Sequence, residues 1–522
     1  MKIVVIGSGL GGLSTATMLA RIGHEVIVLE QQARVGGCLQ SFQRGDAHFE
    51  TGMHYIGSAA PGEPLHRLLT TLGVLPAVTL SPLRRDAYDI VRLGGEEYCF
   101  ANGREAFLDG MLRHFPDARQ ALDVYVQTLD EVSAASSIDR LFGTAADEGQ
   151  AAAILARYQA VSTDAMIESL CAGHPRLAAV LAGRLPLIAA RRGCTPYLLH
   201  AFITSFYESS AWRIAGGSSQ IAQALVQQIA QAGGQVLTRC RVTAITADSH
   251  GVTGVQTTDG RHFVADYVIA DCHPAITLQL VAAGGSSMLR PAFVHRIASL
   301  EQTPACFVAY VTFRRDTVPY MPSNLFAYAG SSPWQCEEYA ADEWPKGYLF
   351  MPMCDADSQR YMRSAMLLSY MKWSDVAPWA DTRTGHRGEA YEAFKAERAE
   401  RLLAAFGHDR PDLCRHIEAV WTSTPLTYRD YNGTPFGAMY GTAPDCRLGP
   451  AARVPIRWRL PGLLQTGQCV NSHGILGTLI GAMQTALHIP GAREPLARLF
   501  GVEPEEIPVC GRSEIHDQGQ SR

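Results

Sequence analysis

A glycine-rich turn between an apolar strand and a helix limits the fold of this chain more than any other feature. The run Gly7–Gly12 (GSGLGG) directly follows Lys2–Ile6, which is apolar and predicted to be a buried strand. Apolar residues then recur at helical spacing up to Gly23, and Glu25–Glu30 has the pattern of a second strand. A short strand–helix–strand unit predicts a parallel sheet with helices on its faces.

The spacing of these glycines is typical of a turn that holds a dinucleotide. Gly7 allows the tight turn, Gly9 lets the backbone approach a pyrophosphate, and Gly12 allows the helix to pack closely against the strand. The amino terminus of the helix would then face the diphosphate with free N–H groups and a partial positive charge. Glu30 ends the second strand, and its carboxylate would accept hydrogen bonds from a ribose diol. The first 30 residues therefore predict dinucleotide binding.

Length and composition exclude several classes of function. A chain of 522 residues, 47% of them hydrophobic, exceeds one hydrophobic core and predicts two or more domains. The net charge is -5 and no run of lysine or arginine occurs, so nucleic acid is not an expected partner. The 13 cysteines are scattered without a Cys-x-x-Cys pair or a Cys/His cluster, which predicts neither a bound metal nor a dithiol redox pair.

No segment has the pattern of a secretory leader or a membrane-spanning helix. The apolar run at the amino terminus is only about five residues long, and no stretch reaches the roughly 18 apolar residues that a spanning helix needs. We expect a cytoplasmic protein, and peripheral contact with one face of a membrane stays open. The sequence does not indicate an oligomeric state.

The order of strand-like and helix-like segments predicts two domains, each assembled from separate parts of the chain. Residues 1–70, 212–290 and 455–490 are predicted to form an α/β domain of the Rossmann type. Residues 71–211 and 291–454 are expected to form an inserted α+β substrate domain. Residues 508–522 are polar and predicted to be a flexible tail.

A second pair of glycines extends the predicted nucleotide site. Arg34, Gly36 and Gly37 follow the acidic strand end, and Ser41 comes four residues later. This block resembles the Arg-x-Gly-Gly signature of the glucose-inhibited-division and amine-oxidase flavoprotein superfamily. The resemblance implies non-covalently bound FAD in a glutathione-reductase-like domain with three layers, two of β-sheet and one of α-helices (ββα). Cys38 replaces the second arginine of the signature, and we expect this lone thiol to be structural.

Two further blocks resemble one branch of this superfamily, the retinol saturases, carotenoid isomerases and bacterial phytoene desaturases. Glu50–Gly57 (ETGMHYIG) matches an acid-x-Gly-x-His-Tyr-x-Gly string, and Thr424–Pro435 is the second block. The resemblance implies that His54 and Tyr55 lie beside the isoalloxazine ring and that Tyr428 lies where the flavin and substrate sites meet. We predict catalytic roles for these three residues; the alternative is that their polar tips are satisfied structurally.

The carboxyl-terminal block is similar to the segment that holds the ribityl chain and flavin ring in this family. Gly467-Gln468 stands where most relatives have Gly-Asp, and an amide can still hold a hydroxyl. The helix that follows would direct its amino terminus at the pyrimidine edge of the flavin, where negative charge collects on reduction. The predicted cofactor-binding residues are Gly7, Ser8, Gly9, Gly11, Gly12, Glu30, Gln31, Arg34, Gly36, Gly37, Cys38, Met53, His54, Val242, Gly467, Gln468, Gly474, Ile475 and Gly477.

One apolar helix face is a candidate wall for a substrate tunnel. Leu198, Leu199, Phe202, Ile203 and Phe206 lie at the spacing of a single face. The alternatives are an ordinary core face or, if exposed, a face that dips into a bilayer surface. The predicted substrate-binding residues are Phe202, Phe206, Tyr428 and Tyr440.

The resemblance implies redox chemistry at flavin N5 on a carbon–carbon double bond of a long apolar isoprenoid or polyene. Saturation, desaturation and cis–trans isomerisation stay open, although Gln468 and the Gly36-Gly37-Cys38 string favour the retinol-saturase side. Two alternatives remain. An amine-oxidase-like enzyme would need an aromatic cage and a lysine–water site near the flavin. A non-catalytic prenyl-lipid escort of the GDP-dissociation-inhibitor type would bind a prenyl chain and would not use flavin for catalysis.

Overall fold

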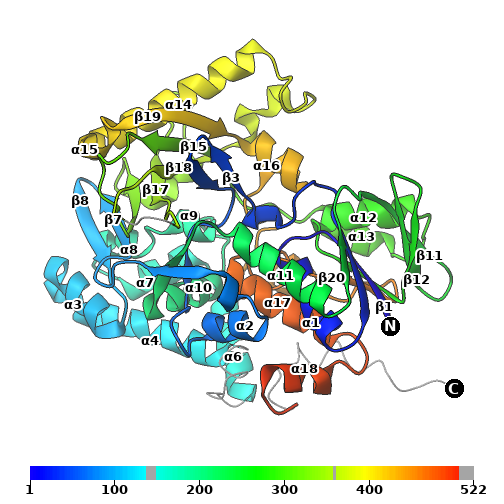
Figure 1. The fold of residues 1–522 in the computed structure, drawn as a ribbon. Helices are drawn as coiled ribbons and strands as arrows, with labels where there is room; N and C mark the ends of the chain where they lie inside the picture. The colour runs from blue at the N-terminus through cyan, green and yellow to red at the C-terminus, as the bar shows by residue number, and fades with distance from the viewer. Residues whose placement is uncertain (137–147, 357–359, 505–522) are drawn as a thin grey trace.

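Two large sheets organise the computed structural model, which describes residues 1–136, 148–356 and 360–504. A five-stranded parallel sheet and a seven-stranded mixed sheet lie in separate parts of the molecule (Figure 1). The predicted flexible tail, residues 508–522, lies outside the described residues.

The five-stranded sheet is parallel throughout, as the first 30 residues predict. Its order is β10–β2–β1–β14–β20, so strands from three distant parts of the chain meet in one sheet. Their bounds are β1 Lys2–Ile6, β2 Glu25–Leu29, β10 Gln235–Leu237, β14 Tyr267–Ala270 and β20 Leu463–Gln465. Because the strands are parallel, their carboxyl ends all open on the same edge of the sheet, where ligands of such sheets bind.

Strand β1 shows how both faces of this sheet are covered. Its side chains alternate, with Ile3 and Val5 in one hydrophobic core and Val4 and Ile6 in another. The first core is shared with three helices, α1 Leu10–Arg21, α11 Ser219–Gln231 and α17 Ile475–Leu487, which lie side by side in Figure 1. The second core is shared with β11 Val242–Ala247, β12 Val252–Thr257, β13 His262–Val264, α12 Pro274–Ala283 and α13 Pro291–Ala298. The layers are antiparallel sheet, parallel sheet and helices, which confirms the predicted fold class.

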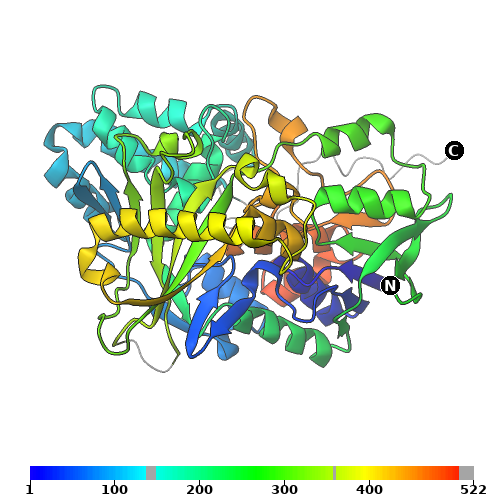
Figure 2. The ribbon, with the colours of Figure 1, turned by 90° about the horizontal axis from the view of Figure 1, so that it is seen from above.

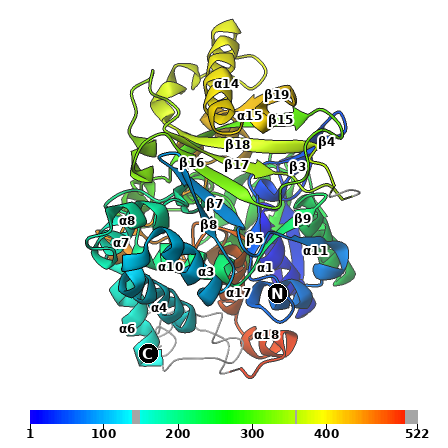
Figure 3. The same cartoon turned by 90° about the vertical axis from the view of Figure 1, so that its left-hand side faces the viewer.

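The seven-stranded sheet has the order β19–β15–β18–β17–β16–β7–β8. Its strands are β7 Asp89–Leu93, β8 Glu96–Phe100, β15 Ala305–Phe313, β16 Asn324–Tyr328, β17 Gly347–Pro352, β18 Ser364–Met371 and β19 Ile417–Ser423. Helix α14 (Glu389–Asp409) runs across one face (Figure 2), and a group of helices that includes α4 and α10 lies on the other (Figure 3). Alternate residues of β15 face opposite sides of the sheet. Phe307 packs in the hydrophobic core that includes residues of α14, whereas Val308 packs in the core that includes residues of α4 and α10.

The remaining elements connect the two large sheets. The helices are α2 Pro64–Thr71, α3 Arg104–His114, α4 Arg119–Ala135, α6 Glu148–Gln159, α7 Thr163–Leu170, α8 Pro175–Leu181, α9 Leu185–Ile188, α10 Tyr197–Ser209, α15 Pro411–Cys414, α16 Pro425–Asn432 and α18 Arg493–Phe500. The short strands are β3 Ser41–Arg44, β4 Ala47–Glu50, β5 Ile56–Gly57, β6 Thr79–Pro82 and β9 Ala211–Ala215.

Helix α18 begins after residue 490, yet Leu496 and Phe500 belong to the core beneath the parallel sheet. The domain boundaries stay a prediction, and we propose that the first domain extends through α18.

Helix α10 carries the predicted apolar face. Leu199, Ile203 and Phe206 are buried, and Leu198 and Phe202 are half-buried. Ile203 and Phe206 line the cavity described below, whereas His200, on another side of α10, contacts the Tyr125 hydroxyl of α4 at 3.0 Å. The apolar face is therefore buried, which contradicts the alternative of an exposed face on this helix, and membrane contact elsewhere stays a prediction. Within the described residues, no helix combines the length and the apolar character that crossing a membrane requires.

A fully buried ion pair lies between the seven-stranded sheet and the helical group. Arg184 Nη1 is 3.7 Å from Asp89 Oδ2, with side chains 1% and 0% exposed. Asp89 also accepts hydrogen bonds from the Tyr55 hydroxyl at 2.8 Å and from Asn324 Nδ2 at 2.8 Å. Arg184 donates to the Tyr88 hydroxyl at 2.8 Å. The polar network therefore ties the strand that begins at Asp89 to the segment that carries Tyr55.

Replacing Arg184 with methionine should destabilise the protein strongly. The substitution keeps most of the side-chain volume but leaves the buried carboxylate of Asp89 without its cation, a loss of about 3–5 kcal/mol. Arg84→Met is the matched control, because the Arg84–Asp86 pair is exposed and worth at most about 1 kcal/mol. Urea unfolding of both variants measures the difference. Equal unfolding midpoints would contradict a stabilising role for the buried pair.

Candidate functional site

A cavity of about 1090 Å³ opens at the carboxyl edge of the parallel sheet. Its wall is built by the turn after β1, the end of β2, the segments around Gly36 and His54, the loop after β14, and the loop between β20 and α17. Apart from the loop after β14, these are the blocks that the sequence patterns indicated one by one. The fold brings them together because β1, β2, β14 and β20 end side by side.

The first glycine turn has the geometry that a diphosphate cradle needs. Gly7 has φ +101° and its amide donates to the Leu29 carbonyl at 2.9 Å, which fixes the turn against the end of β2. A Cβ on Gly11 would lie 2.6 Å from the Gly467 Cα, and one on Gly12 would collide with the Gly7 carbonyl. Gly9 precedes α1 and has no side chain to cap it, so the first amides of the helix form a site for an anion, next to the carboxyl group of Asp271.

Glu30 and the second glycine pair close this end of the cavity. The Glu30 carboxylate accepts hydrogen bonds from the Ser8 amide at 2.9 Å, the Ser8 hydroxyl at 2.6 Å and the Gln32 amide at 2.7 Å. Gly36 has φ +115° and its amide donates to the Ser8 carbonyl at 2.9 Å. A Cβ on Gly37 would lie 3.3 Å from the Gly9 Cα, so the second turn packs on the first. Glycine backbone forms much of this part of the wall, and the carboxylate of Glu30 completes it.

Cys38 and Arg34 differ in position. Cys38 lines the cavity, and burial raises the pKa of its thiol to about 11, so the reactive thiolate does not form near neutral pH. Arg34 is exposed and lines a separate hollow beside Arg44 and His48. The structure therefore does not place Arg34 in the wall of the main cavity. Gly12 is also absent from the wall, because it lies in the contact between α1 and the turn after β1. The other predicted cofactor-binding residues all line the cavity.

The block after β20 forms the far wall. Gly467 has φ +93° and Gly474 has φ +80°, and helix α17 begins at Ile475. Gly477 faces the Ser472 side chain so closely that a Cβ there would collide with its hydroxyl. These features leave the amino terminus of α17 open to the cavity, which fits the predicted contact with a flavin ring. The cradle as a whole fits a dinucleotide flavin.

The predicted catalytic residues His54 and Tyr55 both line the cavity. His54 Nδ1 has no hydrogen-bond partner, and burial together with the Arg213 charge lowers the pKa of the imidazole to about 4. The imidazole is therefore neutral at physiological pH. The Tyr55 hydroxyl donates to Asp89 and its pKa is raised, chiefly by burial, so its proton stays in place.

The four predicted substrate-binding residues separate into two pairs. Phe206 and Tyr440 line the cavity, whereas Phe202 packs behind Phe206 with ring centroids 4.4 Å apart. Tyr428 is buried outside the cavity wall, and its hydroxyl donates to the Thr51 carbonyl at 3.3 Å. The structure thus brings Phe206 and Tyr440 together with His54 and Tyr55, and not Phe202 or Tyr428.

Several wall residues were missed by the sequence analysis. His473 is buried, stacks on Tyr440 with ring centroids 4.1 Å apart, and has no partner at Nε2. Tyr207 contacts Tyr55 at 4.6 Å between ring centroids, and Leu187 lies on the same side. Asp271 follows β14 directly and lies against the glycine turn. Only Asp271 had a usable signal, because a polar residue right after a buried parallel strand projects into the ligand edge.

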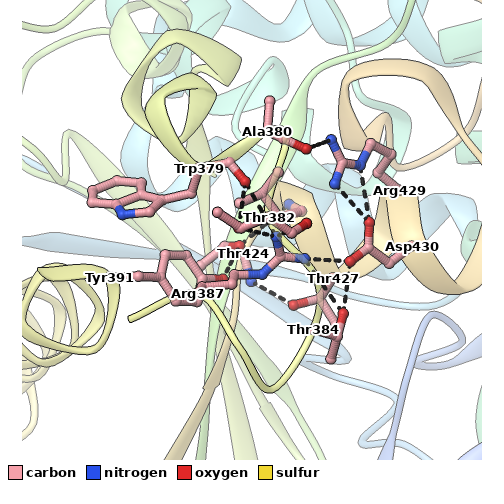
Figure 4. Close-up of polar contacts among 11 residues, drawn as sticks. Trp379, Ala380, Thr382, Thr384, Arg387, Tyr391, Thr424, Thr427, Arg429 and Asp430 are labelled. Atoms are coloured by element: carbon pink, nitrogen blue, oxygen red, sulfur yellow. Dashed lines mark hydrogen bonds and ion pairs between the residues drawn. The ribbon is translucent and has the colours of Figure 1, made fainter. Parts of the chain in front are cut away.

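Ion pairs and hydrogen bonds hold the end of α16 and the turn that follows it (Figure 4). Asp430, at the end of α16, is paired with Arg387 and with Arg429, and accepts a hydrogen bond from the Thr384 hydroxyl at 2.6 Å. Helix α16 begins with a capping box formed by Thr424 and Thr427. These contacts fix residues 429–434, which line the cavity.

A substitution of Gly11 with alanine should weaken FAD binding by at least about tenfold, or about 1.4 kcal/mol. The added Cβ meets backbone atoms of Gly467 at 2.6 and 2.7 Å, so the turn and the β20 loop must separate. Gly110→Ala is the matched control, since it is also a helical glycine and its nearest neighbour would be 3.8 Å away. Titration of the apoprotein with FAD, followed by flavin fluorescence, measures both. Unchanged affinity in the Gly11 variant would contradict the assignment of this turn.

Comparison with known proteins agrees with this geometry. The curated relatives include the human all-trans-retinol 13,14-reductase, which is 28% identical over 92% of this chain and 84% of its own length. The 15-cis-phytoene desaturase of Capsicum annuum is 40% identical over 14% of this chain and 12% of its own length. Among solved structures, an oxidoreductase from Methanosarcina mazei superposes with a TM-score of 0.62 at 17% identity, over 92% of this chain and 99% of that one. Residues 10–487 match the family described as flavin containing amine oxidoreductase, so the chain belongs to that family and is an FAD-dependent oxidoreductase.

Proposed function

We propose that the protein transfers electrons between FAD and a carbon–carbon double bond of a long, uncharged polyene or isoprenoid. The retinol reductases support this proposal, because relatives of that name match 92% of the chain. The phytoene desaturase similarity covers only 14% of the chain. Saturation of a double bond is therefore the favoured direction.

One observation carries the proposal, namely the absence of charge at the substrate end of the cavity. Leu187, Ile203, Phe206, Tyr207 and Tyr440 line this end. In the described part of the wall, the carboxylates are Glu30, Asp271 and Asp430. The first two lie at the glycine turns, and Asp430 lies near the end of α16. Aromatic rings fit either a polyene or an ammonium group, so the missing counter-ion distinguishes them: a polyene needs none, whereas a buried protonated amine loses hydration that a carboxylate would have to replace.

The histidines of the wall contribute hydrogen bonds without charge. Burial lowers the pKa of His54 and of His473 to about 4, so each is a neutral imidazole at physiological pH. His54 is the predicted catalytic residue with an unpaired polar atom at the cavity, and we propose that it relays the proton that a reduced double bond must take up. Tyr55 and Tyr428 would then have structural roles, since their hydroxyls donate hydrogen bonds to Asp89 and to the Thr51 carbonyl. Bound FAD supplies the hydride chemistry.

The two alternative functions lack support at this site. An amine-oxidase-like site would place a lysine near the flavin, and no lysine lines the described part of the cavity. A lipid escort would not need the glycine cradle, yet a Cβ on Gly9, Gly11 or Gly12 would collide with a neighbour at 2.5, 2.6 and 2.4 Å respectively. An escort would purify colourless and fail to take up FAD.

Anaerobic mixing tests the proposed function directly. Holoenzyme that has been photoreduced is mixed with an all-trans polyene alcohol, and the flavin spectrum and the mass of the product are recorded. We expect the flavin to reoxidise and the product to gain two hydrogen atoms. If no polyene alters the flavin and a primary amine bleaches the oxidised enzyme instead, the proposal fails.

The substrate wall can be tested separately from the cofactor. Ile203→Trp fills the apolar end of the cavity, and should raise the KM for a polyene severalfold while FAD affinity stays the same. Val124→Trp on the exposed side of α4 is the control for the size of the introduced ring. A variant that loses FAD but keeps its KM would show that Ile203 lies at the cofactor instead.

A further inference from the structure

Asp271 lies where the two glycine blocks of the cofactor site face each other. Its side chain follows β14, the strand between β1 and β20. A Cβ on Gly9 would lie 2.5 Å from Asp271 Oδ2, and a Cβ on Gly467 would lie 2.5 Å from Oδ1. The carboxyl group therefore lies against both parts of the backbone that cradle the dinucleotide, and it lines the cavity.

The surroundings of this carboxyl group do not stabilise a negative charge well. Its Oδ2 is shielded from solvent and has no hydrogen-bond partner of normal geometry. Burial raises the pKa of Asp271 to about 7, the amides of Gly12 and Gly9 oppose that shift, and the carboxylate of Glu30 adds to it. Among the residues that the structure describes, the charges that shift this pKa include no arginine or lysine. A diphosphate bound at the same helix terminus would bring more negative charge to it.

We infer that Asp271 holds the FAD as a neutral carboxylic acid, donating a hydrogen bond to the cofactor, so that FAD binding takes up one proton. The proton passes from solvent to the Asp271 carboxylate, and no bond of the cofactor changes. A carboxylate in this position would compete with the diphosphate for the first amides of α1, whereas the protonated acid adds a donor to them. Asp271 is thus a positioning residue for the cofactor.

Other titrating groups that face Asp271 stay in one form near neutral pH. The thiols of Cys38 and Cys272 have pKa values raised by burial to about 11 and about 12, and burial also raises the pKa of Cys469. In the cavity wall, burial lowers the pKa of His54, His273 and His473 to about 4. Glu30 already accepts hydrogen bonds from Ser8 and Gln32. Glu50, whose pKa burial raises to about 8, binds Ser218 outside this cavity.

The pH dependence of FAD affinity follows from this assignment. FAD binding raises the pKa of Asp271. The affinity for FAD is therefore greatest below the pKa of Asp271 in the FAD-free protein, about 7, and falls as pH rises above it. The dissociation constant should increase by up to about tenfold per pH unit over that range. Asp271→Asn keeps a donor and has no proton to exchange. It should bind FAD with an affinity that is nearly independent of pH, and up to about a hundredfold more tightly than the wild type at pH about 9.

Apoprotein titrated with FAD from pH 6 to pH 9, by fluorescence and by calorimetry, tests this inference. Calorimetry of the wild type in two buffers of different ionisation enthalpy counts the protons, and we expect uptake approaching one at about pH 8 and near zero at about pH 6. Asp266→Asn, at the other end of β14, and Glu50→Gln are controls that should keep the wild-type slope. Asp271→Ser is the second variant if Asp271→Asn does not fold, and it should also lose the slope.

Three results would overturn the inference. One is a wild-type dissociation constant that does not change with pH. Another is absence of proton uptake at about pH 8. The third is an Asp271 variant with the wild-type slope, or a Glu50 variant without it. All of these readouts concern cofactor binding alone, so they stand apart from any assay of the polyene reaction.

Discussion

The close approach of the Gly11 and Gly467 backbones determines how the rest of the site is built. These residues are separated by most of the chain, yet no side chain fits between them. The contact holds the start of α1 against the end of β20, with β14 between the strands that carry them. The cofactor cradle is therefore a property of the sheet order rather than of any one motif. Everything placed on the ends of β1, β14 and β20 is forced into the same cavity.

Patterns confined to short segments predicted the fold well. The strand–turn–helix unit at the amino terminus was sufficient to predict a parallel sheet, because periodicity and glycine spacing are local properties. The seven-stranded sheet was harder to foresee, since its strands come from residues 89–100 and 305–423. Their pairing depends on contacts across the chain. Periodicity also could not decide whether the apolar face of α10 would be exposed, and the structure shows it covered.

Local sequence patterns were also limited in predicting the site, because they do not show which distant segments come into contact. Motif resemblance located His54 and Tyr440 in the cavity wall, but it also pointed to Tyr428, whose hydroxyl instead contacts the Thr51 backbone. The Arg184–Asp89 pair had no signal at all, because a buried ion pair leaves no periodic pattern in either segment. Asp271 illustrates an intermediate case. Its position after a strand was visible in the sequence, whereas its contact with two glycine blocks required the sheet order.

Charge divides the cavity into two chemically different ends. Around the glycine turns, the wall combines backbone amides with the carboxyl groups of Glu30 and Asp271. Backbone amides and, as we infer, the proton on Asp271 help to compensate the charge of a diphosphate there, and Arg241 and Arg429 also line the cavity. At the other end, neutral imidazoles and aromatic rings face the space beside α17. A hydrocarbon chain loses nothing on entering such an environment, whereas an ammonium group would lose its hydration without gaining a counter-ion. The distribution of charge in one cavity thus accounts both for a negatively charged cofactor and for an uncharged substrate.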